Sequence, residues 1–227
     1  ARAGLPQVVV VQSDSGMMGG KIAHEFMLLT DAGEDTIVLS DADDYCANLE
    51  VASGEIVAYP EEEKPLEKVH TPGYRTIEEV TGFLGVETHR AAKAVFYDHD
   101  ADGRLVLALV RGDRDVNEVK LAKVIQALPE PASDERILAA GAVPGFASPI
   151  GLDPAKVRIV ADHTVSASNN LVTGANETDY HYIGFNLKRD VPGVSTVDIV
   201  EVQEGDGSPT GKGVLKFSRG IEVGNIF

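Results

Sequence analysis

The chain has 227 residues, of which 43% are hydrophobic and 25% are charged, and this composition is typical of a soluble globular protein. No apolar run approaches the roughly 20 residues of a membrane span, and the N-terminus shows no secretory signal, so we expect no membrane contact and a cytoplasmic location. The single cysteine, Cys46, excludes an intramolecular disulfide and a multi-cysteine zinc site. A formal net charge of −16 disfavours broad contact with nucleic acid, and charge alone favours an acidic enzyme without such a partner.

The two ends of the chain predict one small antiparallel β-structure. Strand candidates rich in β-branched or alternating apolar residues occur at residues 8–11, 22–29 and 36–39. A glycine-rich connection at 16–20 separates the first two of them. Three short strands are too few to bury a core alone, so we expect the C-terminal residues 214–227 to pair with them.

Two polar, proline-containing stretches, residues 61–65 and 203–213, bracket the middle of the chain, as linkers around an inserted domain would. Inside these brackets, Thr76 and Glu79 form a capping box for a helix over 77–84. The elements that follow are a hairpin of 94–97 with 105–110, helices at 115–128 and 133–141, and strands at 157–161, 180–185 and 197–202. This order predicts an α/β (α+β) domain with a mixed sheet.

Metal sites are not expected. Asp98, Asp100 and Asp102 imitate the first half of a calcium loop, but its twelfth position is Leu109, where a glutamate is needed. A solvated hairpin turn explains these carboxylates better. The His, Asp and Glu residues show no spacing typical of a zinc hydrolase.

The glycine-rich loop of residues 141–149 is the strongest local candidate for a site. Glycines remove side-chain bulk and allow positive φ, so exposed backbone N–H groups can surround a carbonyl or anionic oxygen. An ordinary helix-to-strand connection is the alternative interpretation, and loop statistics favour it. Strand alternation places His181 opposite Tyr180 and Tyr182, although a single histidine in a strand is more often structural than catalytic.

Ordered strings of residues carry a more specific signal than any of these patterns. They include 16–26 (GMMGGKIAHEF), 44–50 (DYCANLE) and 219–224 (RGIEVG) at the two ends, and 71–73 (TPG), 110–113 (VRGD), 162–165 (DHTV), 173–176 (TGAN) and 181–184 (HYIG) between them. Together they resemble the bacterial-type prolyl-tRNA synthetases over nearly the whole chain. The resemblance implies an editing domain at residues 53–212, of the aminoacyl-tRNA deacylase type. It would be inserted between two stubs of a class II catalytic core, residues 1–52 and 213–227.

The resemblance also implies an activity. The inserted domain would hydrolyse mischarged alanyl-tRNA(Pro), with a pocket that accepts alanine and excludes proline. Catalysis would be assisted by the substrate, so no side-chain nucleophile and no cofactor are expected for editing. The implied partners are the acceptor end of tRNA(Pro) and the rest of the synthetase core, in a parent that forms a homodimer. A non-catalytic module that binds the acceptor end or packs the core remains the alternative.

The parent enzyme would ligate proline to tRNA(Pro) with ATP and Mg²⁺. The chain shows none of the three class II motifs, so we do not expect it to aminoacylate alone. His24 and Glu25 fall in what would be the parent's proline site.

Site residues follow from the resemblance position by position. The family's Gly-x-x-x-Pro loop falls on Gly145 to Pro149, whose backbone N–H groups would hold the ester carbonyl. The residues expected to be catalytic are Gly145, Pro149, Asp162 and His181, the last two by orienting the alanyl amine. The residues expected to bind substrate are Thr76, Phe146, Ala147, Ser148 and Gly174.

Two positions depart from the family pattern. A lysine important for editing is expected a few residues along the strand that begins near Lys93, and counting along that strand reaches Asp98 instead. A carboxylate cannot hold a phosphate, so another cation would have to do so. The histidine usually found before the final Ile-Phe is Asn225, which affects only proline binding in the core.

Overall fold

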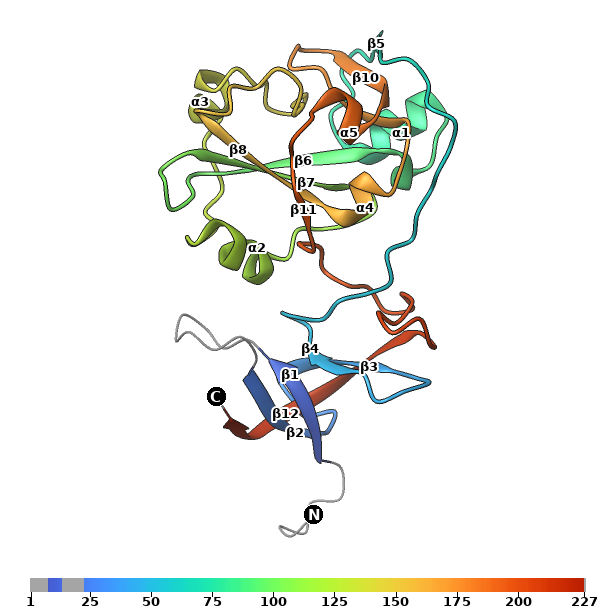
Figure 1. Ribbon diagram of the computed structural model, residues 1–227, viewed down its shortest axis with the longest axis vertical. Coiled ribbons are helices and arrows are strands. Elements are labelled where there is room, and N and C mark those ends of the chain that lie inside the picture. Colours follow the sequence, from blue (N-terminus) through green and yellow to red (C-terminus); the bar gives the residue numbers. More distant parts are fainter. Residues whose placement is uncertain (1–7, 14–22, 227) are drawn as a thin grey trace. The chain divides into compact units, whose positions relative to one another are not determined.

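The computed structural model describes residues 8–13 and 23–226, so the predicted glycine connection at 16–20 lies outside the described residues (Figure 1). The chain divides into two compact units, one formed by residues 1–55 with 201–227 and the other by residues 56–200. The second unit is shorter than the inserted segment expected at 53–212, mainly because residues 201–212 cluster with the ends of the chain.

The terminal unit is a closed barrel in the order β1 (Val8–Ser13), β2 (Ala23–Leu29), β12 (Leu215–Ile226), β3 (Asp35–Ser40) and β4 (Cys46–Asn48). The long strand β12 pairs antiparallel with both β2 and β3, as the C-terminal pattern predicts. Val11, Met27 and Ile37 are completely buried inside the barrel. Burial also raises the pKa of the Cys46 thiol to about 11, so this cysteine is a poor nucleophile.

The central unit is built on a mixed four-stranded sheet in the order β11 (Thr196–Val197), β8 (Val157–Asp162), β7 (Leu105–Arg111) and β6 (Ala92–Tyr97). β6 and β7 are antiparallel, whereas β7 and β8 are parallel. Every residue of β7 is buried, because alternate side chains enter two different cores. Helix α2 (Glu118–Ile125) packs on one of these cores and α3 (Asp134–Ala139) on the other.

A second sheet, with three antiparallel strands in the order β5 (Glu67–His70), β10 (Tyr180–Phe185) and β9 (Leu171–Gly174), completes the central unit. Helix α1 (Ile77–Leu84) lies near it, and Val80 of this helix packs against Ala91 and Val172. In Figure 1, α1 lies beside β10 and the β5 edge. The mixed α/β class predicted from the sequence is confirmed.

Several elements differ from the predicted ones. The capping box of Thr76 and Glu79 is present, and α1 begins where expected. Helix α2 is shorter than residues 115–128, because the Asn117 side chain caps it at Lys120 N and Gln126 turns left-handed at its end. The strand predicted at 197–202 is wrong beyond Val197. The N–H of Ile199 donates to the Asp162 carboxylate instead of to a strand partner.

Short elements were not predicted. Besides β4, β5 and β9, they are the 3₁₀-helix η2 (Thr88–Arg90), α4 (His163–Ser166) and α5 (Leu187–Asp190). Each spans three or four residues, which is too short for a hydrophobic period to develop. In the described part of the chain, no helix has the length and apolar character needed to cross a membrane.

Candidate active site

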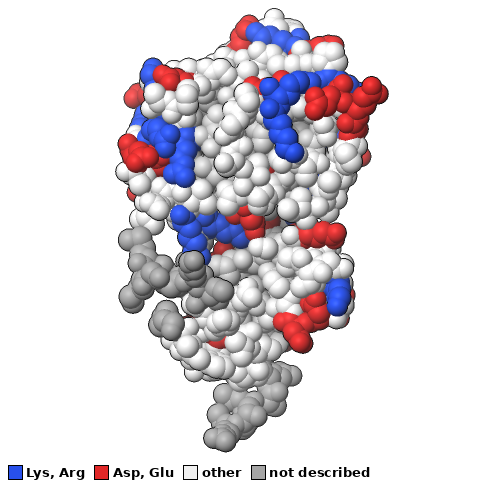
Figure 2. Space-filling model, viewed as in Figure 1, with Lys and Arg blue, Asp and Glu red and all other residues white. Residues whose placement is uncertain are grey.

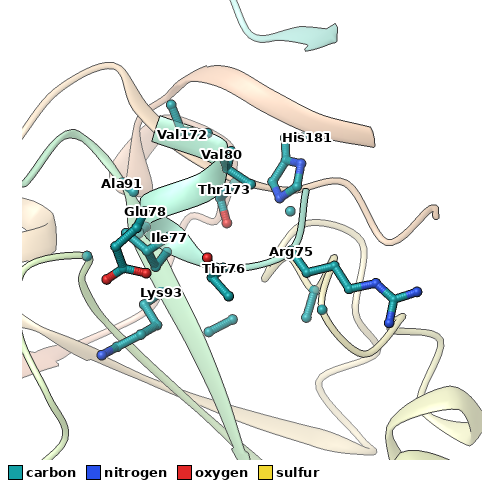
Figure 3. A pocket seen from close by; sticks show the side chains of 16 residues that line it. Arg75, Thr76, Ile77, Glu78, Val80, Ala91, Lys93, Val172, Thr173 and His181 are labelled. Atoms are coloured by element: carbon teal, nitrogen blue, oxygen red, sulfur yellow. The ribbon is translucent and has the colours of Figure 1, made fainter. Parts of the chain in front are cut away.

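A pocket of about 340 Å³ opens in the central unit between the first turn of α1, strands β6, β9 and β10, and the loop at 145–147. This volume is at the lower end of the range for ligand pockets, which suits a small group. Ile77, Val80, Ala91 and Val172 form an apolar wall. Six polar or charged residues also line the pocket, and Figure 3 shows their side chains: Arg75, Thr76, Glu78, Lys93, Thr173 and His181.

His181 is held in a neutral state. Its ring is buried, and burial lowers the pKa of His181 below the ordinary value of 6.5. Nδ1 lies 2.6 Å from the hydroxyl of Thr71, which is also completely buried and 3.3 Å from the carbonyl oxygen of Asp179. The hydroxyl has one proton, so when Thr71 donates to Asp179 it accepts from Nδ1–H, and the Nε2 lone pair of His181 is left free.

Thr71 was missed by the sequence reasoning, which placed the pocket threonine at Thr76 only. Thr76 does line the pocket, but its side chain also caps α1 by accepting from Glu79 N at 3.2 Å. The sequence feature that could have identified Thr71 is the family-like TPG string at residues 71–73, shortly before helix α1. The hydrogen bond to His181 depends on β5 and β10 lying side by side, which no local pattern reveals.

The loop at 145–148 is held against β9 by a very close approach. A Cβ on Gly174 would lie 2.2 Å from the carbonyl carbon and oxygen of Phe146, so only glycine fits at this position. The side chain of Asn176 accepts from Ser148 N at 2.8 Å and donates to the carbonyl oxygens of Ser148 and Ile150 at 3.1 and 3.0 Å. These contacts fix the loop's backbone without any metal or charged group.

Two residues of this loop that line the pocket have backbone N–H groups without an acceptor among the described residues. Phe146 N donates to Val143 O at 2.9 Å, and Ser148 N is used by Asn176. Among the described residues, none accepts from the N–H of Gly145 or of Ala147, and both residues line the pocket. Gly145 has a φ of +81°, the left-handed conformation that glycine adopts without strain. The pair is therefore available to an oxygen atom inside the pocket.

On the strand where the family lysine is expected, Lys93 is the cation that lines the pocket. It lies on β6, and its ammonium group pairs with Asp115 at 2.6 Å. Asp98, the position that the family lysine would take, follows directly after β6, which ends at Tyr97. Asp98 instead pairs with Arg136 at 2.6 Å and contacts His99, away from the pocket. Its carboxylate therefore does not replace a cation of the pocket.

Asp162 is not one of the residues that line the pocket, which corrects the role expected for it. Its side chain is buried and caps α4, accepting from Thr164 N at 2.8 Å and from Thr164 Oγ1 at 2.6 Å. Its second oxygen accepts from Ile199 N at 3.0 Å. Both carboxylate oxygens thus accept hydrogen bonds that hold the fold together, and Asp162 has a structural role outside the pocket.

The remaining expected residues are divided among several places. Ala147 and Gly174 line the pocket. Phe146 and Ser148 belong to the same loop as Ala147, but their side chains are buried and do not line the pocket. Phe146 packs there against the His181 ring, with ring centroids 5.6 Å apart. Pro149 lines a different hollow of about 630 Å³, so its role is limited to shaping the loop.

His24, Glu25 and Asn225 belong to the terminal unit. His24 is exposed, and Glu25 accepts a hydrogen bond from Ser13 Oγ. Asn225 lies opposite Glu25 in the pairing of β2 with β12. Across residues 8–13 and 23–226, the His, Cys, Asp and Glu side chains form no group of three or more that could hold a metal ion.

Residues 71–190 match the family described as the aminoacyl-tRNA editing domain, and this match includes the pocket, its loop and His181. The chain belongs to this editing-domain family. The resemblance to bacterial prolyl-tRNA synthetases is confirmed as well. A proline–tRNA ligase of Bacillus licheniformis is 48% identical over 96% of this chain, and that of Bacillus subtilis is 46% identical over 100% of it. The chain spans only 38% and 40% of the lengths of these two relatives.

Solved structures show the same fold. The hypothetical protein APE2540 matches with a TM-score of 0.53 and 18% identity, over 60% of this chain and 92% of that chain. A protein described as a candidate trans-editing enzyme for prolyl tRNA synthetase matches with a TM-score of 0.53 and 19% identity, over 60% and 87% of the two chains. At these identities the likeness extends to the fold alone.

Replacing the Asp162 side chain is predicted to destabilise the central unit. In Asp162→Ala, the N–H groups of Thr164 and Ile199 lose their acceptor inside the protein, and we expect a loss of about 2–3 kcal/mol in the free energy of unfolding. Asp153→Ala removes a comparable but exposed contact to Ala155 N and is the matched control, with an expected loss below about 1 kcal/mol. Urea unfolding measures both. Equal stability of Asp162→Ala and wild type would show that the cap is dispensable.

The protonation state of His181 is predicted to differ from that of an exposed histidine. In an NMR titration, we expect the His181 midpoint to lie below 6.5, because the charged ring would lose its hydration in the buried site. The same shift makes the folded state lose stability as the pH falls below 6.5, since the unfolded chain then binds more protons. A midpoint at or above 6.5 would refute the neutral, buried imidazole.

Proposed function

We propose that the central unit of this editing-domain protein hydrolyses the ester of alanyl-tRNA(Pro) and releases alanine and tRNA. One observation supports this most strongly: the N–H groups of Gly145 and Ala147 have no acceptor among the described residues, and both residues line the same small pocket as an apolar wall. An ester carbonyl needs such donors, because negative charge develops on its oxygen in the transition state. The methyl group of alanine is apolar, and it is stabilised by packing against the apolar wall.

The reaction follows from this arrangement. With the carbonyl oxygen between the two N–H groups, the α-carbon projects toward the apolar wall, which takes the methyl group. A water molecule attacks the carbonyl carbon, and the bond from this carbon to the ribose oxygen breaks. The proton lost by the water ends on the ribose oxygen that leaves. The free Nε2 of His181 accepts a hydrogen bond from the alanyl amine and so orients the substrate.

Selection against proline is a matter of space. Binding energy alone would favour the larger residue, because proline adds two methylenes to the apolar contact. The wall of Ile77 and Val80 belongs to a helix fixed by its capping box, so it does not yield to a ring. We propose that this rigid wall excludes the prolyl group and thereby protects correctly charged tRNA.

The wider context is also part of the proposal. The acceptor end of tRNA(Pro) would be the substrate partner, and the remainder of a homodimeric, cytoplasmic synthetase would be the protein partner. We propose that editing needs no cofactor, because the loop and the substrate supply the required groups. ATP and Mg²⁺ would serve only the ligation of proline in the parent enzyme, at residues other than this pocket.

Deacylation assays test the function directly. With alanyl-tRNA(Pro) and prolyl-tRNA(Pro) as substrates, we expect this chain to release alanine well above the buffer rate and proline at close to the buffer rate. The rival function is a module that binds the acceptor end or packs the core without catalysis. Release of alanine at the buffer rate, by a chain shown to be folded, would favour that rival.

The glycine at position 145 provides a sharper test. In Gly145→Ala, a φ of +81° disfavours the new side chain, and its Cβ would lie 3.3 Å from Arg75 Cδ, so the loop backbone or the Arg75 side chain must move. We expect alanyl-tRNA hydrolysis to fall on the order of 100-fold, the cost of losing one oxyanion donor. Gly141→Ala is the matched control, since Gly141 has a φ of +89°, no atom near its added Cβ and no place in the pocket. Similar loss of activity in both variants would assign the effect to backbone strain.

A further inference from the structure

The guanidinium group of Arg75 differs from those of the other arginines in the central unit, all of whose residues the structure describes. Seven arginines of this unit form ion pairs with carboxylates: Arg90, Arg104, Arg111, Arg114, Arg136, Arg158 and Arg189. On the face shown in Figure 2, acidic and basic side chains lie next to each other in several groups on an otherwise uncharged surface. Arg75 is exposed and forms no such pair within residues 56–200.

Arg75 is nevertheless held in place at the pocket. Its side chain passes over Gly145, and its guanidinium carbon lies 5.6 Å from the centroid of the Phe146 ring. The carboxylate of Glu79 interacts electrostatically with Arg75 but forms no ion pair with its guanidinium group, and it accepts from the backbone N–H groups of Arg75 and Thr76, each at 3.1 Å. The guanidinium donors of Arg75 therefore have no carboxylate partner within the central unit.

The two cations that line the pocket are not equivalent. Figure 3 shows Arg75 on the opposite side of the pocket from Lys93 and Glu78. The ammonium group of Lys93 is already paired with Asp115, whereas the guanidinium of Arg75 has donors available. The aliphatic part of the Arg75 side chain also lies beside Gly145 of the loop, since a Cβ built on Gly145 would be 3.3 Å from Arg75 Cδ.

We propose that Arg75 binds a backbone phosphate of the terminal nucleotides of the tRNA. This inference rests on the proposed function, which places the aminoacyl ester between the N–H groups of Gly145 and Ala147. The ribose then lies outside the loop, and its 5′-phosphate reaches the rim where Arg75 is held. A guanidinium group binds phosphate through two parallel hydrogen bonds. In a chain with a net charge of −16, this local cation supplies the attraction that the overall charge does not.

The test compares a substrate that has phosphates with one that has none. For Arg75→Gln, we expect KM for alanyl-tRNA(Pro) to rise about tenfold, the effect of losing one charge-assisted contact. With alanyl-adenosine, which carries the same ester but no phosphate, we expect a change several-fold smaller. Arg75→Lys, which keeps the charge but not the fork, should recover part of the loss. Lys188→Gln, on an exposed residue away from the pocket, is the control and should change neither substrate.

A binding measurement separates this inference from the editing function, because it needs no hydrolysis. For an RNA minihelix ending in CCA, we expect Arg75→Gln to weaken binding and to lower the slope of log Kd against log salt concentration by about 1. Wild type that binds in this way but hydrolyses nothing would refute the editing function and leave the phosphate contact standing. Equal binding of the minihelix by wild type and Arg75→Gln, or equal loss with both ester substrates, would overturn the role of Arg75.

Discussion

The close packing of Gly174 against Phe146 is the contact on which the site depends. Because residue 174 has no side chain, β9 approaches the backbone of the loop at a distance that a Cβ would block. The same strand region carries Asn176, whose amide then reaches Ser148 and Ile150. The loop is thereby fixed with Gly145 and Ala147, whose N–H groups have no acceptor among the described residues, at the pocket. A larger residue at position 174 would prevent this close approach of β9 to the loop.

A site made of backbone donors fits the proposed hydrolysis, which needs no conventional catalytic residue. Cys46 is a poor nucleophile and belongs to the terminal unit, and Asp162 caps α4. His181 is buried and its pKa is lowered, so in the proposed reaction it acts through its hydrogen bonds and not through a charge. Fixed dipoles stabilise an oxyanion effectively because they need no reorganisation during the reaction. In the proposed reaction, the substrate supplies the remaining groups.

The sequence was sufficient where a signal is local. The capping box of Thr76 and Glu79 needs only a spacing of three residues, and it located the helix that forms one wall of the pocket. The glycine loop was identified from its composition and from the family resemblance. The strand near Lys93 was identified as well, but the sequence did not show that Lys93 lines the pocket and that Asp98, just after the strand, pairs with Arg136 instead.

The rest of the site depends on contacts between distant segments. Thr71 and His181 are 110 residues apart and meet only because β5 and β10 pair. Asp162 follows a strand end, as many site residues do, yet its partner Ile199 comes from a segment predicted to be a strand. No periodicity distinguishes a carboxylate that binds substrate from one that caps a helix. Likewise, the sequence does not show that Arg75 differs from the other arginines of the central unit. This difference requires the ion pairs seen in the structure.

The central claim is that the backbone N–H groups of Gly145 and Ala147 hold the ester carbonyl. Amide NMR spectra of the chain, recorded as a non-hydrolysable 3′-alanylamido-adenosine is added, test it most directly. The account predicts large downfield shifts of the Gly145 and Ala147 amide protons as these donors gain an acceptor, with smaller shifts for Phe146 and Ser148, whose donors are already used. Saturable binding that leaves the Gly145 and Ala147 signals in place would contradict the account.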